Sequence, residues 1–212
     1  MSRTRIKICG IASIDDAKLA VDAGADALGM IFAESPRRVD LATAQAIAEE
    51  IPAWVTLVGV FVNPEPQEVA QAFLYGIVPQ FSGSEMPEFC EKLISGKRYL
   101  KVFHIKPGEA YVAEDFAELD AYTHATFMFD TSAGGKSGGT GVAFDWNVVK
   151  AVSATRSVIV AGGLTPENVG ACVRQARPFG VDVRSGVETD GKKDEVKVRA
   201  FVRAVREVDA ET

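Results

Sequence analysis

Short apolar runs rich in branched and aromatic residues alternate with amphipathic segments along this chain. The runs have the length and composition of buried strands. They are RIKIC (5–9), DALGMIF (26–32), WVTLVGVFV (54–62), IVPQF (77–81), YLKVFHI (99–105), ATFMFD (125–130), SVIVAG (157–162) and GVDVRS (180–185). A segment with helical spacing or helix signals follows each run, so the pattern predicts a repeated strand–helix order.

Capping residues mark where several of the helices begin. Ser13 stands at an N-cap position with Asp16 three residues later, and Asp40 precedes an apolar stripe. Thr165-Pro166 predicts a helix that starts there, because proline is favoured at the first helical position. The segment EDFAELDAY (114–122) is long enough for only a turn or two of helix.

Such a series predicts parallel strands joined by right-handed crossovers. No composition shift or linker divides the chain, so we expect an α/β fold in which residues 1–212 form a single eight-stranded parallel (β/α)8 TIM barrel domain. A doubly wound open sheet is the alternative. In a barrel, functional side chains gather at the carboxyl ends of the strands, and candidate chemistry is sought there.

Composition narrows the possible functions. The net charge of -6 disfavours a nucleic-acid or anionic-membrane surface, and the sequence has no apolar run long enough to span a bilayer. It has three cysteines and two histidines, without a C-x-x-C pair, which disfavours a disulfide framework or a metal site. The N-terminus lacks the apolar stretch of a signal peptide, so we expect a cytoplasmic protein.

The first strand ends in Cys9. Side chains alternate along a strand, so Lys7 and Cys9 share one face, while Ile6 and Ile8 face the helices. A thiol beside a cation loses its proton more easily and becomes a competent base or nucleophile. The alternative is that Cys9 is a small buried hydrophobic residue, as we expect for Cys90 and Cys172 on helical apolar stripes.

The sixth strand ends in Asp130, which shares a face with Thr126 and Met128. Phe127 and Phe129 occupy the other face, under the helices. A carboxylate at the end of a barrel strand, followed by a glycine-rich loop, is a candidate general acid or base. The alternative is that it caps the loop.

That loop, within FMFDTSAGGKSGGTGVAFDW (127–146), contains a GKS triplet. A Walker A motif requires glycine at the position of Asp130, and a serine-hydrolase elbow at Ser137 requires a later histidine, so both are excluded. Glycines also end the seventh and eighth strands. Backbone N–H groups in such loops bind phosphate in many barrels. The loops that predict a phosphate site here are Gly138–Gly141, Ala161–Gly163 and Ser185–Gly186.

Taken together, these segments resemble the phosphoribosylanthranilate isomerase family of tryptophan biosynthesis. The resemblance runs in order from the first strand to the eighth. Its motifs are K-I-C-G, F-x-x-S-P-R (32–37), V-G-V-F-V-N (58–63), F-D-T (129–131), G-G-T-G-x-x-F-D-W (138–146), A-G-G-L (161–164) and D-V-x-S-G-V-E (182–188).

The resemblance implies an Amadori rearrangement of N-(5-phosphoribosyl)anthranilate to the 1-deoxyribulose 5-phosphate isomer, without metal or cofactor. It implies that Asp130 is the general acid and Cys9 the base that removes the C2 proton. Arg37 would bind the anthranilate carboxylate, and Asp182 would lie near the substrate amine. The backbone around the predicted loops would hold the phosphate, at Gly139, Gly141, Gly162, Gly163, Ser185 and Gly186. We expect a small phosphosugar as the partner and leave monomer or homodimer open.

Three positions depart from the family pattern. Ser82 stands where the family usually has histidine, Arg184 where it has a small residue, and Ile11-Ala12 where it has a pair ending in Thr or Arg. Arg184 is expected either to contact phosphate or to pair with Asp182. Two other functions stay open. One is a different phosphosugar barrel of histidine or tryptophan metabolism, and the other is a diverged phosphosugar-binding barrel without catalysis.

Overall fold

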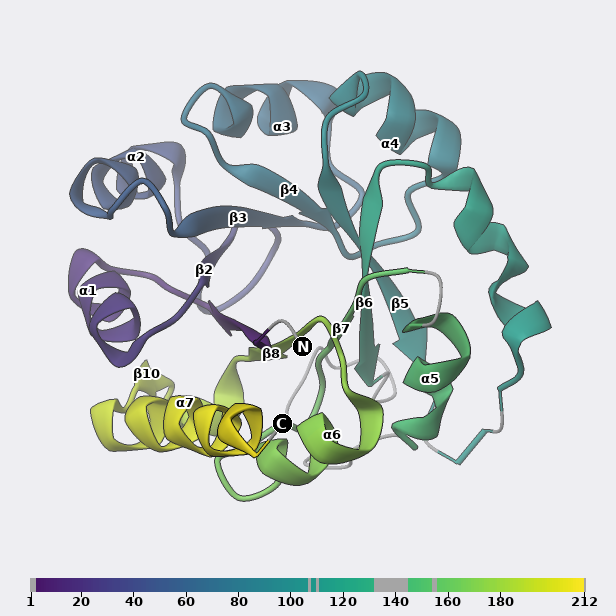
Figure 1. Ribbon diagram of the computed structural model, residues 1–212. Coiled ribbons are helices and arrows are strands. Elements are labelled where there is room, and N and C mark those ends of the chain that lie inside the picture. Colours follow the sequence, from purple (N-terminus) through teal and green to yellow (C-terminus); the bar gives the residue numbers. More distant parts are fainter. Residues whose placement is uncertain (1–2, 107, 110, 132–144, 154–155, 212) are drawn as a thin grey trace.

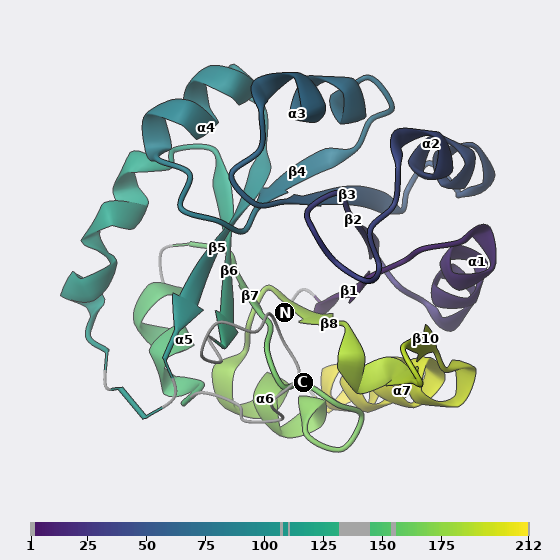
Figure 2. The same cartoon turned by 180° about the vertical axis from the view of Figure 1, so that it is seen from behind.

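Eight parallel strands close into a barrel with helices around its outside, as Figures 1 and 2 show from opposite sides. The computed structural model describes residues 3–106, 108–109, 111–131, 145–153 and 156–211. The strands follow one another in chain order, and β1 pairs with β8 to close the circle. This confirms the barrel over the open sheet. They are β1 Arg5–Cys9, β2 Ala27–Ile31, β3 Thr56–Phe61, β4 Val78–Phe81, β5 Tyr99–Ile105, β6 Ala125–Thr131, β7 Val158–Val160 and β8 Gly180–Val183.

The helices lie outside the strands, in the order in which the chain reaches them (Figure 1). A 3-10 helix, η1 Ala113–Ala121, takes the place between β5 and β6, where the sequence predicts only short helical structure. The α-helices are α1 Ile14–Ala23, α2 Leu41–Glu50, α3 Pro66–Phe73, α4 Pro87–Ile94, α5 Asn147–Ser153, α6 Val169–Ala176 and α7 Glu195–Ala210. Between β8 and α7 lie the turn η2 Ser185–Val187 and a small hairpin of β9 Glu188–Thr189 and β10 Lys192–Lys193.

Two of the three predicted helix starts are confirmed. The Ser13 hydroxyl accepts the Asp16 N–H at 3.1 Å, and the Asp40 carboxylate accepts the Thr43 N–H at 2.8 Å. The prediction of a helix from Thr165 is wrong, because α6 begins at Val169. The Asn168 side chain bonds the Thr165 N–H and the Gly163 carbonyl, and these bonds hold residues 165–168 in a turn.

The alternation predicted for β1 and β6 is confirmed. Ile6, Ile8, Phe127 and Phe129 are buried in the large core between strands and helices. Met128 lies instead in a smaller cluster of inward-facing residues; its other buried members are Val58, Leu100, Val102, Ile159 and Ala161. Side chains of opposite alternation therefore fill the two sides of the barrel wall, as the period of two in a strand requires.

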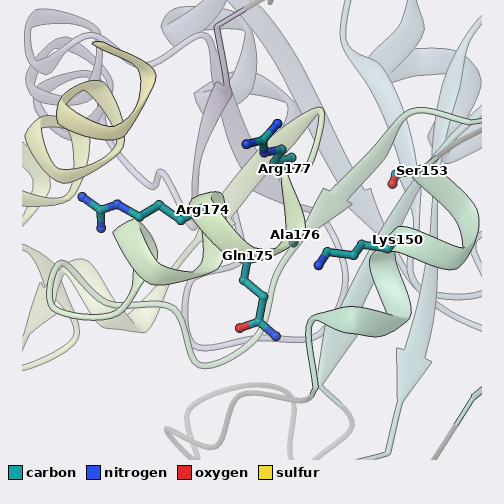
Figure 3. A pocket seen from close by; sticks show the side chains of 6 residues that line it. All are labelled: Lys150, Ser153, Arg174, Gln175, Ala176 and Arg177. Atoms are coloured by element: carbon teal, nitrogen blue, oxygen red, sulfur yellow. The ribbon is translucent and has the colours of Figure 1, made fainter. Parts of the chain in front are cut away.

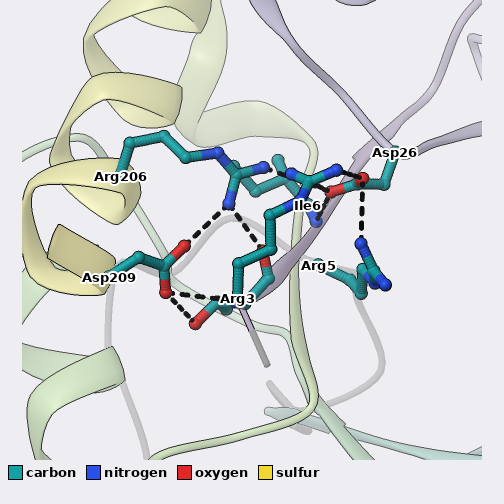
Figure 4. Close-up of polar contacts among 7 residues, drawn as sticks. Arg3, Arg5, Ile6, Asp26, Arg206 and Asp209 are labelled. Carbon is teal, nitrogen blue, oxygen red and sulfur yellow. Dashed lines mark hydrogen bonds and ion pairs between the residues drawn. The ribbon is translucent and has the colours of Figure 1, made fainter. Parts of the chain in front are cut away.

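A polar network joins the start of β1 to the C-terminal helix, at the amino ends of the strands (Figure 4). The Asp26 carboxylate accepts the Ile6 N–H at 2.9 Å and the Arg206 Nη2–H at 3.2 Å, and it pairs with Arg3. Arg206 also donates to the Thr4 carbonyl at 2.7 Å and to Asp209 at 2.8 Å. We call this network the Asp26 clamp. It holds together the two ends of the chain.

No helix in the described part of the chain is long and apolar enough to cross a membrane.

Candidate active site

The predicted catalytic side chains, Cys9 and Asp130, lie at the same end of the barrel. Cys9 is the last residue of β1, and Asp130 is the last but one of β6. The charges of Asp182, near the end of β8, and of Arg184, just beyond it, act on the pKa of both side chains. The closed barrel therefore makes one site from strands that are far apart in sequence.

Cys9 and Lys7 are both buried, and their side chains lie close together. The Lys7 Nζ donates to Asp182 Oδ1 at 2.7 Å, across the β1–β8 pair that closes the barrel. Gly29, beside Cys9 on β2, provides the space, because a Cβ there would lie 2.8 Å from the Cys9 Sγ and 2.9 Å from the Lys7 Nζ. The thiol and the ammonium group thus lie together over the bare backbone of Gly29.

Lys7 lowers the pKa of the Cys9 thiol, as expected, but the net shift of that pKa is upward. Burial raises the pKa of the Cys9 thiol above its usual value of 9.0, and the nearby Asp182 carboxylate raises it further. Lys7, Lys193 and Arg184 act in the opposite direction without reversing the shift. Loss of water therefore outweighs the cations, and the resting thiol keeps its proton.

Burial also raises the pKa of Asp130 above 3.8, and the Asp182 carboxylate adds to the shift. His104 and Arg184 oppose it. His104 is the register neighbour of Asp130 on β5, and its Nε2 lies 3.1 Å from the carbonyl oxygen of Ser82. A raised pKa is what a carboxylic acid needs in order to donate a proton near neutral pH.

Arg37 lies in the loop after β2. Its Nε–H donates to Glu188 Oε1 at 2.9 Å and its Nη2–H to Glu188 Oε2. Its stem and that of Arg184 lie against Gly10, where a Cβ would come within 3.1 Å of Arg37 Cδ and 3.2 Å of Arg184 Cγ. The neighbouring Arg38 is exposed. Arg37 therefore reaches the mouth of the barrel beside Cys9.

Glu188 and Lys193 also belong to this region, and their side chains are buried. Sequence patterns predict no role for either residue. The Lys193 Nζ donates to Glu188 Oε1 at 2.7 Å. Glu188 closes the motif D-V-x-S-G-V-E, which is a signal in the sequence, but its contact with Arg37 spans 151 positions. No local spacing predicts a pair so far apart.

The loops after β7 and β8 touch each other. Gly162 and Gly163 have φ values of +83° and +63°, which favour glycine. A Cβ on Gly186 would lie 1.9 Å from the Leu164 carbonyl oxygen, so the turn η2 packs directly on the loop after β7. Ser185, Gly162, Gly163 and Gly186 are thus brought together, whereas Gly139 and Gly141 lie outside the described residues.

A surface cavity of about 540 Å³ lies elsewhere, at the carboxyl ends of α5 and α6 (Figure 3). It contains none of the predicted site residues; its lining is Lys150, Ser153, Arg174, Gln175, Ala176 and Arg177. Cations at helix carboxyl ends complement the helix dipole, which accounts for the basic lining. Among the residues that the structure describes, no three His, Cys, Asp or Glu side chains are grouped to hold a metal ion.

Comparison with known proteins gives one consistent result. Residues 6–204 match the family model described as N-(5'phosphoribosyl)anthranilate (PRA) isomerase. A Pseudomonas aeruginosa protein named N-(5'-phosphoribosyl)anthranilate isomerase is 46% identical over 214 residues, covering 97% of this chain and 97% of that one.

Solved structures agree with this result. Monomers generated from the dimeric phosphoribosylanthranilate isomerase of Thermotoga maritima superpose with a TM-score of 0.81 at 32% identity, covering 96% of this chain and 99% of theirs. A phosphoribosyl anthranilate isomerase in complex with reduced 1-(o-carboxyphenylamino)-1-deoxyribulose 5-phosphate gives the same TM-score, 0.81, and the same identity, 32%, again over 96% of this chain and 99% of that one.

Proposed function

The chain belongs to the N-(5'-phosphoribosyl)anthranilate isomerase family of tryptophan biosynthesis, and we propose that Asp130 and Cys9 carry the proton transfers of this isomerisation. One observation carries the proposal. The two groups lie at the carboxyl ends of separate strands, at one mouth of the barrel, and the charge of the buried Asp182 raises the pKa of each. An acid and a base that face one substrate from two sides suit an Amadori rearrangement.

Asp130 acts first, as the general acid. It gives its proton to the ribose ring oxygen as the C1–O bond breaks, and the anthranilate nitrogen supplies the electrons that form the iminium. Cys9 then removes the C2 proton, which the iminium makes acidic, to form an enolamine. The enolamine tautomerises to the ketone, so atoms and protons balance and no redox partner takes part.

The proposed roles of Asp130 and Cys9 define which protonation state reacts. The reacting state has Asp130 protonated and Cys9 as thiolate, while burial favours the thiol. The state with Asp130 ionised and Cys9 protonated also holds one proton, so the two states have the same total charge. Their ratio therefore does not change with pH, and the reactive fraction stays constant as long as the pair holds one proton. Lys7, which lies beside the thiol, stabilises the thiolate when it forms.

The remaining residues hold the substrate. Arg37 binds the anthranilate carboxylate, for which a planar guanidinium is suited. Asp182, which Lys7 fixes by a 2.7 Å hydrogen bond, lies near the substrate amine. Phosphate binds to backbone N–H groups of the touching loops, at Gly162, Gly163, Ser185 and Gly186, with Gly139 and Gly141 as further predicted members.

Anthranilate fluorescence tests this proposal when purified protein is incubated with N-(5'-phosphoribosyl)anthranilate. Cys9→Ala and Asp130→Asn are each expected to lower kcat by about 10²–10⁴, the usual contribution of a general acid or base. Cys172→Ala is the matched control, since Cys172 is also a buried thiol but lies in α6, outside the site. Near-normal kcat in either site variant would show that the roles are wrongly assigned.

The same experiment separates the second candidate function. A diverged barrel that only binds phosphosugars would retain the substrate and leave the fluorescence unchanged. The departures at Ser82 and Arg184 are the observations behind that candidate. Cytoplasmic location and a monomeric or homodimeric state stay predictions of the sequence analysis.

A further inference from the structure

We propose that Glu188 and Lys193 are positioning residues that aim Arg37 at the substrate carboxylate and so set specificity for the anthranilate end of the substrate. This rests on the proposed function. The carboxylate of Glu188 and the ammonium group of Lys193 are almost completely buried, with side-chain exposures of 4% and 1%. Buried charges of this kind persist only when they are paired and hydrogen-bonded.

Glu188 fixes the orientation of the Arg37 fork. Its Oε1 accepts the Arg37 Nε–H at 2.9 Å, and its Oε2 accepts an Arg37 Nη2–H. Two parallel bonds to a rigid carboxylate define the plane of the guanidinium, which one bond does not. The Arg37 side chain is 22% exposed, so it is partly accessible from solvent, whereas Glu188 is buried.

This arrangement keeps the other edge of the guanidinium for the substrate. A guanidinium carries five N–H donors, and Glu188 takes one on Nε and one on Nη2. Among the described residues, the Arg37 guanidinium hydrogen-bonds to Glu188, and these bonds do not involve Nη1. The edge formed by Nη1 and the second Nη2–H matches a carboxylate in the bidentate geometry that arginine favours.

Lys193 keeps the charge of the cluster suited to an anion. Without it, Arg37 and Glu188 would neutralise each other. With Lys193 at 2.7 Å from Glu188 Oε1, the three groups carry one surplus positive charge, and Arg37 is the least buried of them. A buried second cation therefore lets Glu188 orient Arg37 without cancelling its attraction for the substrate.

The same lysine connects the two ends of the proposed substrate site. Lys193 also donates to the carbonyl of Arg184 at 3.3 Å, immediately before the turn η2 that we assign to phosphate. Lys197 donates to the Glu188 carbonyl at 2.8 Å from the first turn of α7. The hairpin of β9 and β10 thus fixes the distance between the phosphate turn and the guanidinium.

Binding measurements with two probes test this role. One is reduced 1-(o-carboxyphenylamino)-1-deoxyribulose 5-phosphate, and the other is its phenylamino counterpart, which lacks the carboxylate. We expect Glu188→Gln to weaken the first about tenfold and the second less than about twofold, with KM raised and kcat nearly unchanged. Glu195→Gln, in an exposed pair with Arg199, is the matched control and should change neither.

Repeating the Glu188→Gln measurement in an Arg37→Ala protein shows whether Glu188 acts through Arg37. In an Arg37→Ala protein, Glu188→Gln should add almost no further loss of affinity, because the interaction is already absent. Lys193→Met supplies an independent comparison, with a loss of about threefold to fivefold for the carboxylate probe alone, and serves if Glu188→Gln does not fold. Equal weakening of both probes, or an equal effect of Glu188→Gln in the two backgrounds, would overturn the proposal. Failure of the proposed function appears separately, as absence of turnover in the unmodified protein.

Discussion

Cys9 and Asp130 are both withdrawn from water by the barrel wall, and each holds its proton more firmly for that reason. Charged neighbours also shift the pKa of both groups, but burial has the larger effect on each pKa. Lys7 contacts the thiol region, yet burial remains the larger influence on its pKa. The same burial therefore favours the protonated form of Asp130, which is the reactive one, and disfavours the reactive thiolate of Cys9.

Asp130→Asn is expected to stabilise the protein while it removes activity. The pKa of Asp130 is above 3.8 in the folded state, so its stabilising protonated form is complete below pH 3.8 and is lost as pH rises through the folded pKa. As pH rises above 3.8, the cost of holding this acid in a buried site therefore lowers the free energy of unfolding, and asparagine removes that cost.

Thermal unfolding measures this effect. Tm should rise at pH 7, by roughly 2–4 °C for each kcal/mol regained, and the difference should disappear near pH 3. A lower Tm at pH 7 would mean that the ionised carboxylate makes net stabilising contacts.

The elements of the barrel differ in how far the sequence predicts them. Alternation in RIKIC and ATFMFD predicts correctly which side chains face the helices, because a strand has only two faces. Thr165-Pro166 predicts the start of α6 too early, because the hydrogen bonds of the Asn168 side chain hold residues 165–168 in a turn. Local patterns thus predict elements well and boundaries less well.

The site follows the same division. Strand ends and glycine pairs place Cys9, Asp130, Gly162 and Gly186 at one mouth, since barrel geometry is a property of the pattern. The direction of the Cys9 pKa shift and the Glu188–Arg37 pair are not predictable this way. The first depends on how much water the closed barrel excludes, and the second on a contact across 151 positions.

Gly162→Ala should damage the loop after β7 more than its backbone conformation alone requires. The φ of +83° disfavours alanine by about 1–2 kcal/mol, and the new Cβ would lie 1.8 Å from Thr131 Oγ1 and 2.6 Å from Asp130 Oδ1. We expect loss of stability together with loss of kcat.

Gly76→Ala is the matched control in the connection between α3 and β4. Its φ is +72°, and a Cβ there meets no described atom within 4 Å. Denaturant unfolding of both variants should give Gly162→Ala the larger loss, by about 2 kcal/mol or more, with kcat unchanged in Gly76→Ala. Equal losses would show that the loop adjusts freely.

At the scale of the whole molecule, the residues that stabilise the barrel closure and the residues of the proposed site lie at opposite ends of the strands. The Asp26 clamp holds β1 and α7 at the amino ends of the strands, while Cys9, Asp130 and Arg37 lie at the carboxyl ends. Function at the carboxyl face and stability at the opposite face is the usual division in this fold. The five residues of β1 connect the two faces directly.

Asp26→Asn should lower stability without changing the active site. It removes a charge that pairs with Arg3 and Arg206 while keeping an acceptor for the Ile6 N–H. We expect the free energy of unfolding to fall by about 1–3 kcal/mol, and kcat and KM to stay within about twofold at 25 °C. Lys18→Met, which breaks an exposed pair with Glu50, is the control and should cost less than about 1 kcal/mol. A changed kcat with normal stability would contradict the separation.

The three cysteines are free and buried, so the rate at which each one reacts reports how often the barrel opens around it. A thiol reagent reacts with a buried cysteine only after the structure around it opens. Cys9 lies at the mouth, whereas Cys90 in α4 and Cys172 in α6 lie against the outside of the sheet. The labelling rate of Cys9 therefore reports opening of the active site. The rates of Cys90 and Cys172 report detachment of α4 and of α6.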